Sequence, residues 1–167
     1  MSLRSWFEWV NEFPSSVAIR ESIYGYPYLL TFHAVSMALF AGLIVMMDLR
    51  LLGIAYRRTA LSQVQKQLFP WQMFTMGLAS VSGFVLLYGQ PTRYYGKVFF
   101  WLKMALMVAA GVNALVFHLT TYRTVAAWDS SQRVPLGARL AGALSLVLWA
   151  GVVVFGRITA YNWMTFE

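Results

Sequence analysis

The stretch YLLTFHAVSMALFAGLIVMMDLR, residues 28–50, decides the fold. It is a long apolar run that contains one histidine near its start, His33, and ends with Asp48-Leu49-Arg50. An apolar run of about 18 or more residues with few charges predicts a helix that crosses a membrane. An ionisable side chain inside such a run is costly, so His33 and Asp48 are candidates for a functional site.

The composition of the whole chain supports a membrane protein. Of its 167 residues, 59% are hydrophobic and 11% are charged, whereas soluble domains carry roughly 25% charged residues. The net charge of +7 comes without a basic helix or a glycine-rich basic segment. We therefore expect the basic residues to face lipid headgroups at helix ends, and we expect no nucleic-acid partner. The absence of cysteine excludes disulfides, thiolate metal sites and cysteine nucleophiles.

Three further apolar runs complete an all-α polytopic membrane protein, a four-transmembrane-helix bundle. The helices are expected at about residues 27–53, 69–89, 98–121 and 138–160, within one domain of residues 27–167, and the segments 54–68 and 122–137 are expected to be polar loops. Residues 1–26 form a separate N-terminal segment. Its residues 2–13 place aromatic side chains at helical spacing among charges, which predicts an interfacial amphipathic helix too short to span a bilayer.

Four spans place both termini on one side of the membrane. The two loops on the other side carry seven lysines and arginines, against six on the terminal side. Because positive residues favour the cytoplasmic side, this margin favours termini outside, in the periplasm of a bacterial cell.

The two histidines are expected at different depths. His33 lies about five residues from the middle of its helix, toward the terminal side, and His118 lies about nine residues from the middle of the third helix in the other direction. At a rise of 1.5 Å per residue, the two rings differ in depth by roughly 20 Å. One haem held by both imidazoles of a single chain is therefore not expected.

The same depth argument predicts two polar clusters at opposite ends of the bundle. One contains His33, Lys103 and Arg157, and the other contains Asp48, His118 and Arg139. A purely structural interpretation stays open for each cluster. In it, Asp48 forms a salt bridge with Arg50 or Arg139, and His118 bonds a backbone carbonyl. Asp48, Arg50 and Asn113 then belong to a structural polar network.

Other polar residues in the apolar helices have simpler expected roles. Ser80, Ser82 and Ser145 are expected to form interhelical hydrogen bonds. A small-residue stripe, Ala34, Ala38 and Gly42, permits close approach of another helix.

Two short patterns carry a resemblance to a known family. His33 is followed, after fourteen residues, by DLRLLG at residues 48–53, and residues 113–118 read NALVFH. In these patterns the chain resembles a family of small bacterial four-helix membrane proteins known as a domain of unknown function. The resemblance covers about residues 20 to 161 and implies the fold and the bacterial inner membrane. In outline, the chain also looks like four-helix b-type cytochromes and copper-resistance membrane proteins, through histidines in helices.

Three functions remain open from the sequence. The first is an electron-transfer subunit that binds haem b, with His33 and His118 as iron ligands and Lys103, Arg157 and Arg139 near the propionates. The depth difference then requires two haems near opposite faces, and a two-fold dimer supplies each histidine twice. Met37 and Met104 are alternative soft ligands near the depth of His33.

The second function is a non-catalytic anchor or assembly subunit, in a homodimer or a larger membrane complex. The third is a proton or ion pathway through the two clusters. No hydrolytic or phosphate-binding pattern occurs, so no enzymatic reaction of the chain alone is indicated.

Overall fold

Helices make up all the regular structure in the part of the chain that the computed structural model describes, residues 2–129 and 134–159. Four helices are long and apolar enough to cross a membrane. In chain order the elements are α1 (Leu3–Asn11), α2 (Pro14–Glu21), α3 (Gly25–Leu51), α4 (Leu61–Gly89), α5 (Pro91–Tyr95), α6 (Val98–Leu119), the 3-10 helix η1 (Tyr122–Ala127) and α7 (Leu136–Ile158). The four-transmembrane-helix bundle with an N-terminal amphipathic helix is confirmed.

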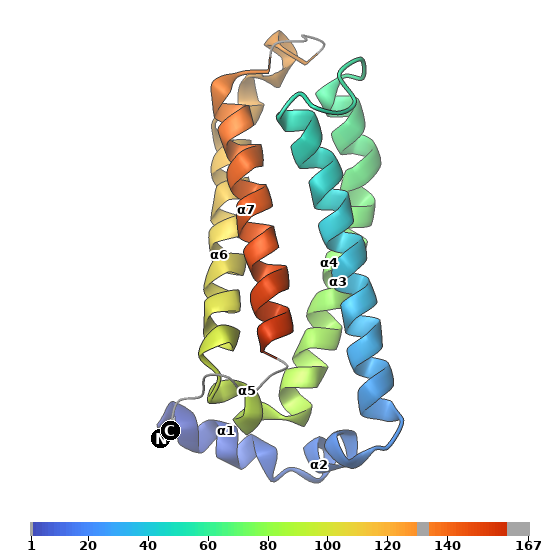
Figure 1. The fold of residues 1–167 in the computed structure, drawn as a ribbon, viewed down its shortest axis with the longest axis vertical. Helices are drawn as coiled ribbons and strands as arrows, with labels where there is room; N and C mark the ends of the chain where they lie inside the picture. Colours follow the sequence, from blue (N-terminus) through green and yellow to red (C-terminus); the bar gives the residue numbers. More distant parts are fainter. Residues whose placement is uncertain (1, 130–133, 160–167) are drawn as a thin grey trace.

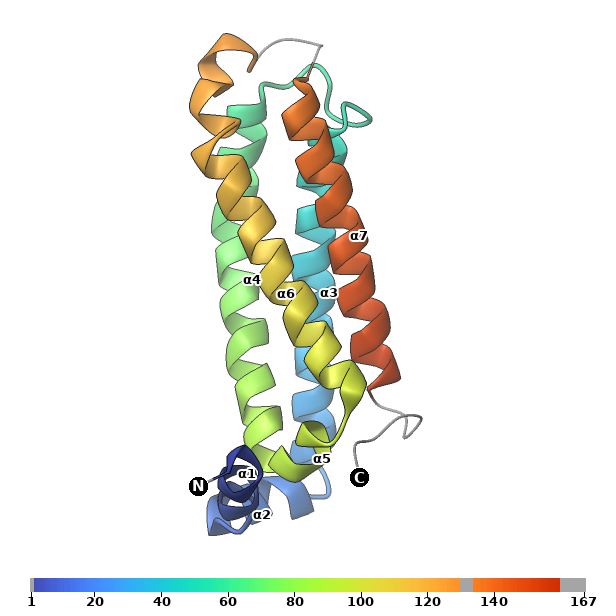
Figure 2. The ribbon, with the colours of Figure 1, turned by 90° about the vertical axis from the view of Figure 1, so that its left-hand side faces the viewer.

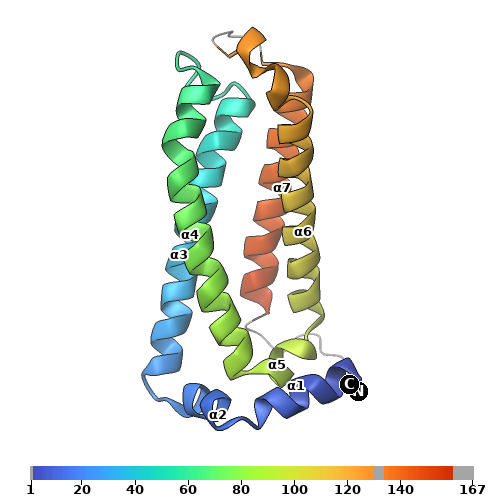
Figure 3. The same cartoon turned by 180° about the vertical axis from the view of Figure 1, so that it is seen from behind.

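The four long helices form two pairs. Helix α3 packs along α4, and α6 packs along α7, while α3 and α7 join the two pairs. Close contacts between α4 and α6 are few or absent, which leaves a seam between these two helices. Figures 1 and 3 show the two pairs side by side, with α1, α2 and α5 lying across one end of the bundle. Figure 2 shows the same end from the side, where the last turn of α7 also lies.

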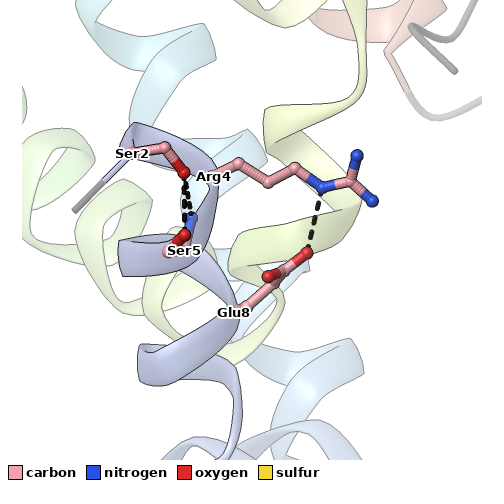
Figure 4. Close-up of polar contacts among 4 residues, drawn as sticks. All are labelled: Ser2, Arg4, Ser5 and Glu8. Carbon is pink, nitrogen blue, oxygen red and sulfur yellow. Dashed lines mark hydrogen bonds and ion pairs between the residues drawn. The ribbon is translucent and has the colours of Figure 1, made fainter.

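Helix α1 has the two faces that an interfacial position requires. The Oγ atom of Ser2 accepts a hydrogen bond from the backbone N–H of Ser5 and so caps the helix (Figure 4). Arg4 and Glu8 form an exposed ion pair one turn apart, the only salt bridge between residues that the structure describes. Phe7 is buried and packs on a ring of α5, whereas Trp9 on the other face is 54% exposed. The polar and aromatic side of α1 therefore remains available to lipid headgroups.

Helix α4 begins at Leu61, so the expected loop 54–68 is wrong for its last eight residues. Pro70 lies inside the helix, where it removes a single backbone hydrogen bond without ending the helix. The start of α4 is instead capped by a side chain from another segment of the chain. The carboxylate of Asp129 accepts hydrogen bonds from the backbone N–H of Ser62 at 2.8 Å and from its hydroxyl at 2.5 Å. A distant side chain thus supplies the cap that the local sequence lacks.

A buried arginine joins the two loops at this end of the bundle. Arg50 is only 2% exposed. Its Nε–H donates to the carbonyl of Thr59 at 3.0 Å, and its Nη2 donates to the carbonyl of Asp129 at 3.4 Å. Because Asp129 also caps α4, these contacts hold α3, the start of α4 and the segment before α7 together.

Replacing Asp129 by alanine is expected to destabilise the protein by about 0.5–2 kcal/mol at pH 7, the usual cost of a lost helix cap. The hydrogen bond from the Ser62 hydroxyl is the main cause that lowers the pKa of Asp129. A carboxyl whose folded pKa is lowered stabilises the fold above its unfolded pKa and stops doing so as the pH falls through the folded value. In detergent, D129A should therefore unfold at a lower temperature than wild type at pH 7. The difference between the two unfolding temperatures should become smaller in acid.

The control is Glu8→Ala, which breaks only the exposed ion pair with Arg4 and should change stability by less than about 1 kcal/mol. Equal unfolding temperatures of D129A and wild type at pH 7 contradict the capping role.

Candidate functional site

A cavity of about 540 Å³ lies between the four membrane-spanning helices. Methionines and aromatic rings form much of its wall, together with a set of polar side chains from all four helices. Those polar residues are His33 and Asp48 of α3, Gln65, Gln72 and Ser80 of α4, Lys103, Asn113 and His118 of α6, and Ser145 of α7. Both histidines that the sequence singled out therefore face one cavity.

The imidazole of His33 is held in a defined orientation by α4. Its Nδ1 lies 3.0 Å from Oγ of Ser82, and that hydroxyl donates its hydrogen to the carbonyl of Leu78 at 2.7 Å. Because a hydroxyl has one hydrogen to give, Ser82 must accept at His33, so Nδ1 carries the proton. The backbone carbonyl of Ala79 is a further acceptor for the imidazole, and the lone pair is then on Nε2. The predicted interhelical role of Ser82 is confirmed.

Gly83 makes room for this ring. A Cβ atom at position 83 would lie 3.0 Å from Cε1 of His33, closer than side chains normally approach. The absence of a side chain at Gly83 therefore lets the imidazole lie directly against the backbone of α4. Ser82 and Gly83 together fix both the hydrogen bond and the position of His33.

Lys103 shares this end of the cavity with His33, near enough for the two groups to interact electrostatically. The aliphatic part of Lys103 runs beside Gly156 of α7, where an added Cβ would lie 3.6 Å from Cδ. Its Nζ makes no hydrogen bond or ion pair with another described residue. Arg157, expected in the same cluster, is exposed and does not line the cavity. The structure thus brings together two of the three predicted members.

His118 contacts α4 at the other end of the cavity. Its Nδ1–H donates to the carbonyl of Ala114 at 3.0 Å, which confirms the predicted backbone bond, and its Nε2 accepts from the side-chain amide of Gln65 at 2.9 Å. Gln65 and Ser82, the partners of the two histidines, are 17 residues apart on α4. At 1.5 Å per residue the imidazoles are separated by about 25 Å along this helix. Two nitrogens on one metal are about 4 Å apart, so the two rings cannot hold the same ion.

The expected salt bridge of Asp48 is wrong. Arg50 follows two residues later on the same helix, and positions i and i+2 do not face each other. Its guanidinium bonds loop carbonyls instead. Arg139 is exposed at the start of α7 and does not line the cavity. The polar side chain that meets the Asp48 carboxyl is Ser145.

Asn113, the third member of the predicted structural network, joins α6 to α7. Its Nδ2 donates to the carbonyl of Ala141 at 2.9 Å. Asp48, Arg50 and Asn113 therefore each have different partners and do not contact one another as one network.

Sequence reasoning missed Gly83 and Gln65 as site residues. Gln65 lies in the segment 54–68, which the sequence predicts as a loop, and no local signal marks Gly83 as the partner of a distant histidine. Within residues 2–129 and 134–159, no three His, Cys, Asp or Glu side chains gather to hold a metal ion.

Gly83→Ala is expected to lower the stability of the protein, because the new methyl group presses on the His33 ring. Gly77 on the same helix is the matched control, since a Cβ there meets nothing within 4 Å. Glycine in a helix interior costs roughly 0.5–1 kcal/mol relative to alanine, so G77A should be neutral or stabilising. Thermal unfolding of both variants measures the difference. A G83A protein as stable as G77A shows that the ring does not need this space.

Comparison with known proteins identifies a family for this chain. The model of a protein family described as "Family of unknown function (DUF6644)" matches residues 6–164, which is most of the chain. The chain therefore belongs to this family. No curated protein and no solved structure matches it.

Proposed function

We propose that this member of the DUF6644 family is an integral membrane subunit that binds haem b at His33 and transfers electrons. The observation that carries the proposal is the fixed imidazole of His33, which lines a cavity inside the membrane domain and, with Nδ1 bonded to Ser82, has its lone pair on Nε2. A metal-binding histidine commonly donates its other N–H to a fixed acceptor, and Ser82 has that position here.

The surroundings of His33 suit a large, flat and mostly apolar group. The cavity volume of about 540 Å³ lies within the usual range for ligand sites. Phe84 and Met76 of α4, with Met104 of α6, contribute apolar wall. Such a wall keeps water from bound iron and so influences its reduction potential. Bound haem would supply one-electron redox chemistry.

Lys103 supplies a positive charge for this site. Lys103 lines the cavity near His33, and its ammonium group has no hydrogen-bond acceptor among the described residues. A haem propionate is a carboxylate, and an ammonium group at this depth is stabilised by such a partner. Arg157 and Arg139 lie outside the cavity lining, so the proposal assigns them no contact with the haem.

The proposal uses a single chain and a single haem. His118 is about 25 Å away along α4, and its Nε2 already accepts a hydrogen bond from Gln65. His33 faces the inside of its own bundle. A second iron ligand would have to come from another helix of the same cavity, and Met104 of α6 lines it.

A role in a homodimer or a larger membrane complex is compatible with this function. The small-residue stripe Ala34, Ala38 and Gly42 is exposed in the single chain, and a Cβ at Gly42 meets nothing within 4 Å. Small residues on a lipid-facing helix surface favour close packing of a second helix. We infer that α3 contacts another chain through this surface.

The haem proposal is tested by reduced-minus-oxidised spectra of the protein purified after haem-replete expression. Wild type should show b-type absorption with about one haem per chain. His33→Ala should lose it, because the iron loses its fixed ligand. His118→Ala is the matched control and should retain it. Ser82→Ala should keep haem but shift its reduction potential, since the hydrogen bond at Nδ1 tunes the ligand.

Equal haem content in the His33→Ala and His118→Ala proteins overturns the assignment to His33. A wild-type protein without haem that co-purifies with other membrane proteins from native membranes favours the anchor or assembly function instead.

The proposal also places the chain in the bacterial inner membrane, with the termini in the periplasm. The chain has no cysteine, so single cysteines can report its orientation without background. A membrane-impermeant maleimide applied to intact spheroplasts should label Ser5→Cys, at the terminal end. Arg58→Cys, in the exposed loop at the opposite end, should react only after the cells are broken. Labelling with the reverse pattern contradicts the orientation and leaves the haem proposal unaffected.

A further inference from the structure

Two buried oxygen atoms in the cavity have no hydrogen-bond partner. They are Oδ2 of Asp48 and Oε1 of Gln65, and within the described residues no other buried side-chain nitrogen or oxygen lacks one. Asp48 is 4% exposed, and both residues line the cavity. Unpaired buried acceptors are costly, so two of them lining one cavity require an explanation.

The two residues lie at nearly the same depth. Gln72 of α4 donates to the carbonyl of Leu43 on α3, which fixes the register of these antiparallel helices. Moving five residues along α3 from Leu43 reaches Asp48, and moving five residues back along α4 from Gln72 reaches Gln67. Gln65 is therefore within about 3 Å of the level of Asp48.

Among the described residues, no cationic side chain forms an ion pair with Asp48. Arg50 is held by the carbonyls of Thr59 and Asp129. Lys103 lies at the His33 end of the cavity, and Arg139 is exposed outside it. The one salt bridge between described residues is on α1, at the other end of the molecule. An isolated carboxylate in such surroundings needs a positive partner.

We propose that Asp48 and Gln65 bind a small hard monovalent cation, Na⁺, inside the membrane domain. Ser145 contributes its hydroxyl oxygen, since it already contacts the Asp48 carboxyl. Asn113 uses its Nδ2 to bond Ala141, which leaves its amide oxygen as a further acceptor on the cavity wall. The four residues come from four different helices, and every offered atom is an oxygen.

The charge and the ligand type decide between cations. Hard cations take carboxylate, amide and hydroxyl oxygens, as this site offers. Protein sites for Ca²⁺ usually have six to eight oxygen ligands and several carboxylates, whereas here a single carboxylate balances a single positive charge. The site is separate from the proposed haem site, because His33 and Asp48 are 15 residues, or about 22 Å, apart on α3.

The test measures thermal unfolding of the purified full-length protein in NaCl, KCl and choline chloride at equal ionic strength and pH. Wild type should unfold at a temperature several degrees higher in NaCl, because a ligand that binds only the folded state stabilises it. Asp48→Asn should unfold at the same temperature in all three salts. Gln65→Met should need about tenfold more Na⁺ for the same shift, which corresponds to the loss of one ligand. Ser80→Ala, at the His33 end of the cavity, is the matched control and should respond as wild type does.

Three results overturn the proposal. The first is a wild-type protein whose stability depends on pH but not on Na⁺, which indicates a protonated Asp48. The second is a Na⁺ response that survives in Asp48→Asn. The third is a Gln65→Met protein with an unchanged Na⁺ response, which remains readable if Asp48→Asn does not fold. The haem spectrum of each variant is recorded in parallel, and it should not change, so failure of this site is distinguished from failure of the haem proposal.

Discussion

A polar side chain inside a lipid bilayer has to find its partner within the protein, because the hydrocarbon offers none. Helix α4 supplies such partners to both histidines and to a carbonyl of α3. Its Ser82 accepts from His33, its Gln72 donates to the carbonyl of Leu43, and its Gln65 donates to His118. These three contacts are spread along α4, and they fix its register against α3 and bridge its seam with α6. The positions of both histidines therefore depend on where α4 begins and how it is turned.

The start of α4 is determined at the loop end of the molecule. Asp129 caps Ser62, and Arg50 ties the carbonyl of Asp129 to the carbonyl of Thr59. Gln65 follows Ser62 by less than one helical turn, so the cap places the amide that meets His118. The contact between the two loops thus influences the position of Gln65 in the cavity, because one turn of helix joins Ser62 to Gln65. Residues that line no site at all, such as Asp129, consequently influence the geometry of one.

The sequence predicts how deep a residue lies along its helix. It does not predict toward which neighbouring helix or loop the side chain points. Apolar runs fixed the number of spans, and the rise per residue separated His33 from His118 in depth. The same rise placed Asp48 and Arg139 in one cluster, but their side chains point to different surroundings. Gly83 was not predictable, because its importance comes from a ring that lies 50 positions earlier in the chain. The start of α4 was not predictable either, because the side chain that caps it, Asp129, lies far along the chain.

The cavity has two chemically different ends, because His33 and Asp48 are about 22 Å apart along α3. At one end a nitrogen ligand and an ammonium group suit an anionic metal complex, and at the other a carboxylate and amide oxygens suit a hard cation. A charge of one unit acting across 20 Å at an effective dielectric constant of about 20 contributes about 1 kcal/mol. That energy is small beside the cost of leaving an ionised group unpaired at membrane depth. Each end must therefore be satisfied by its own partner, because neither the charge of Lys103 nor a cation at Asp48 reaches far enough to stabilise the other end.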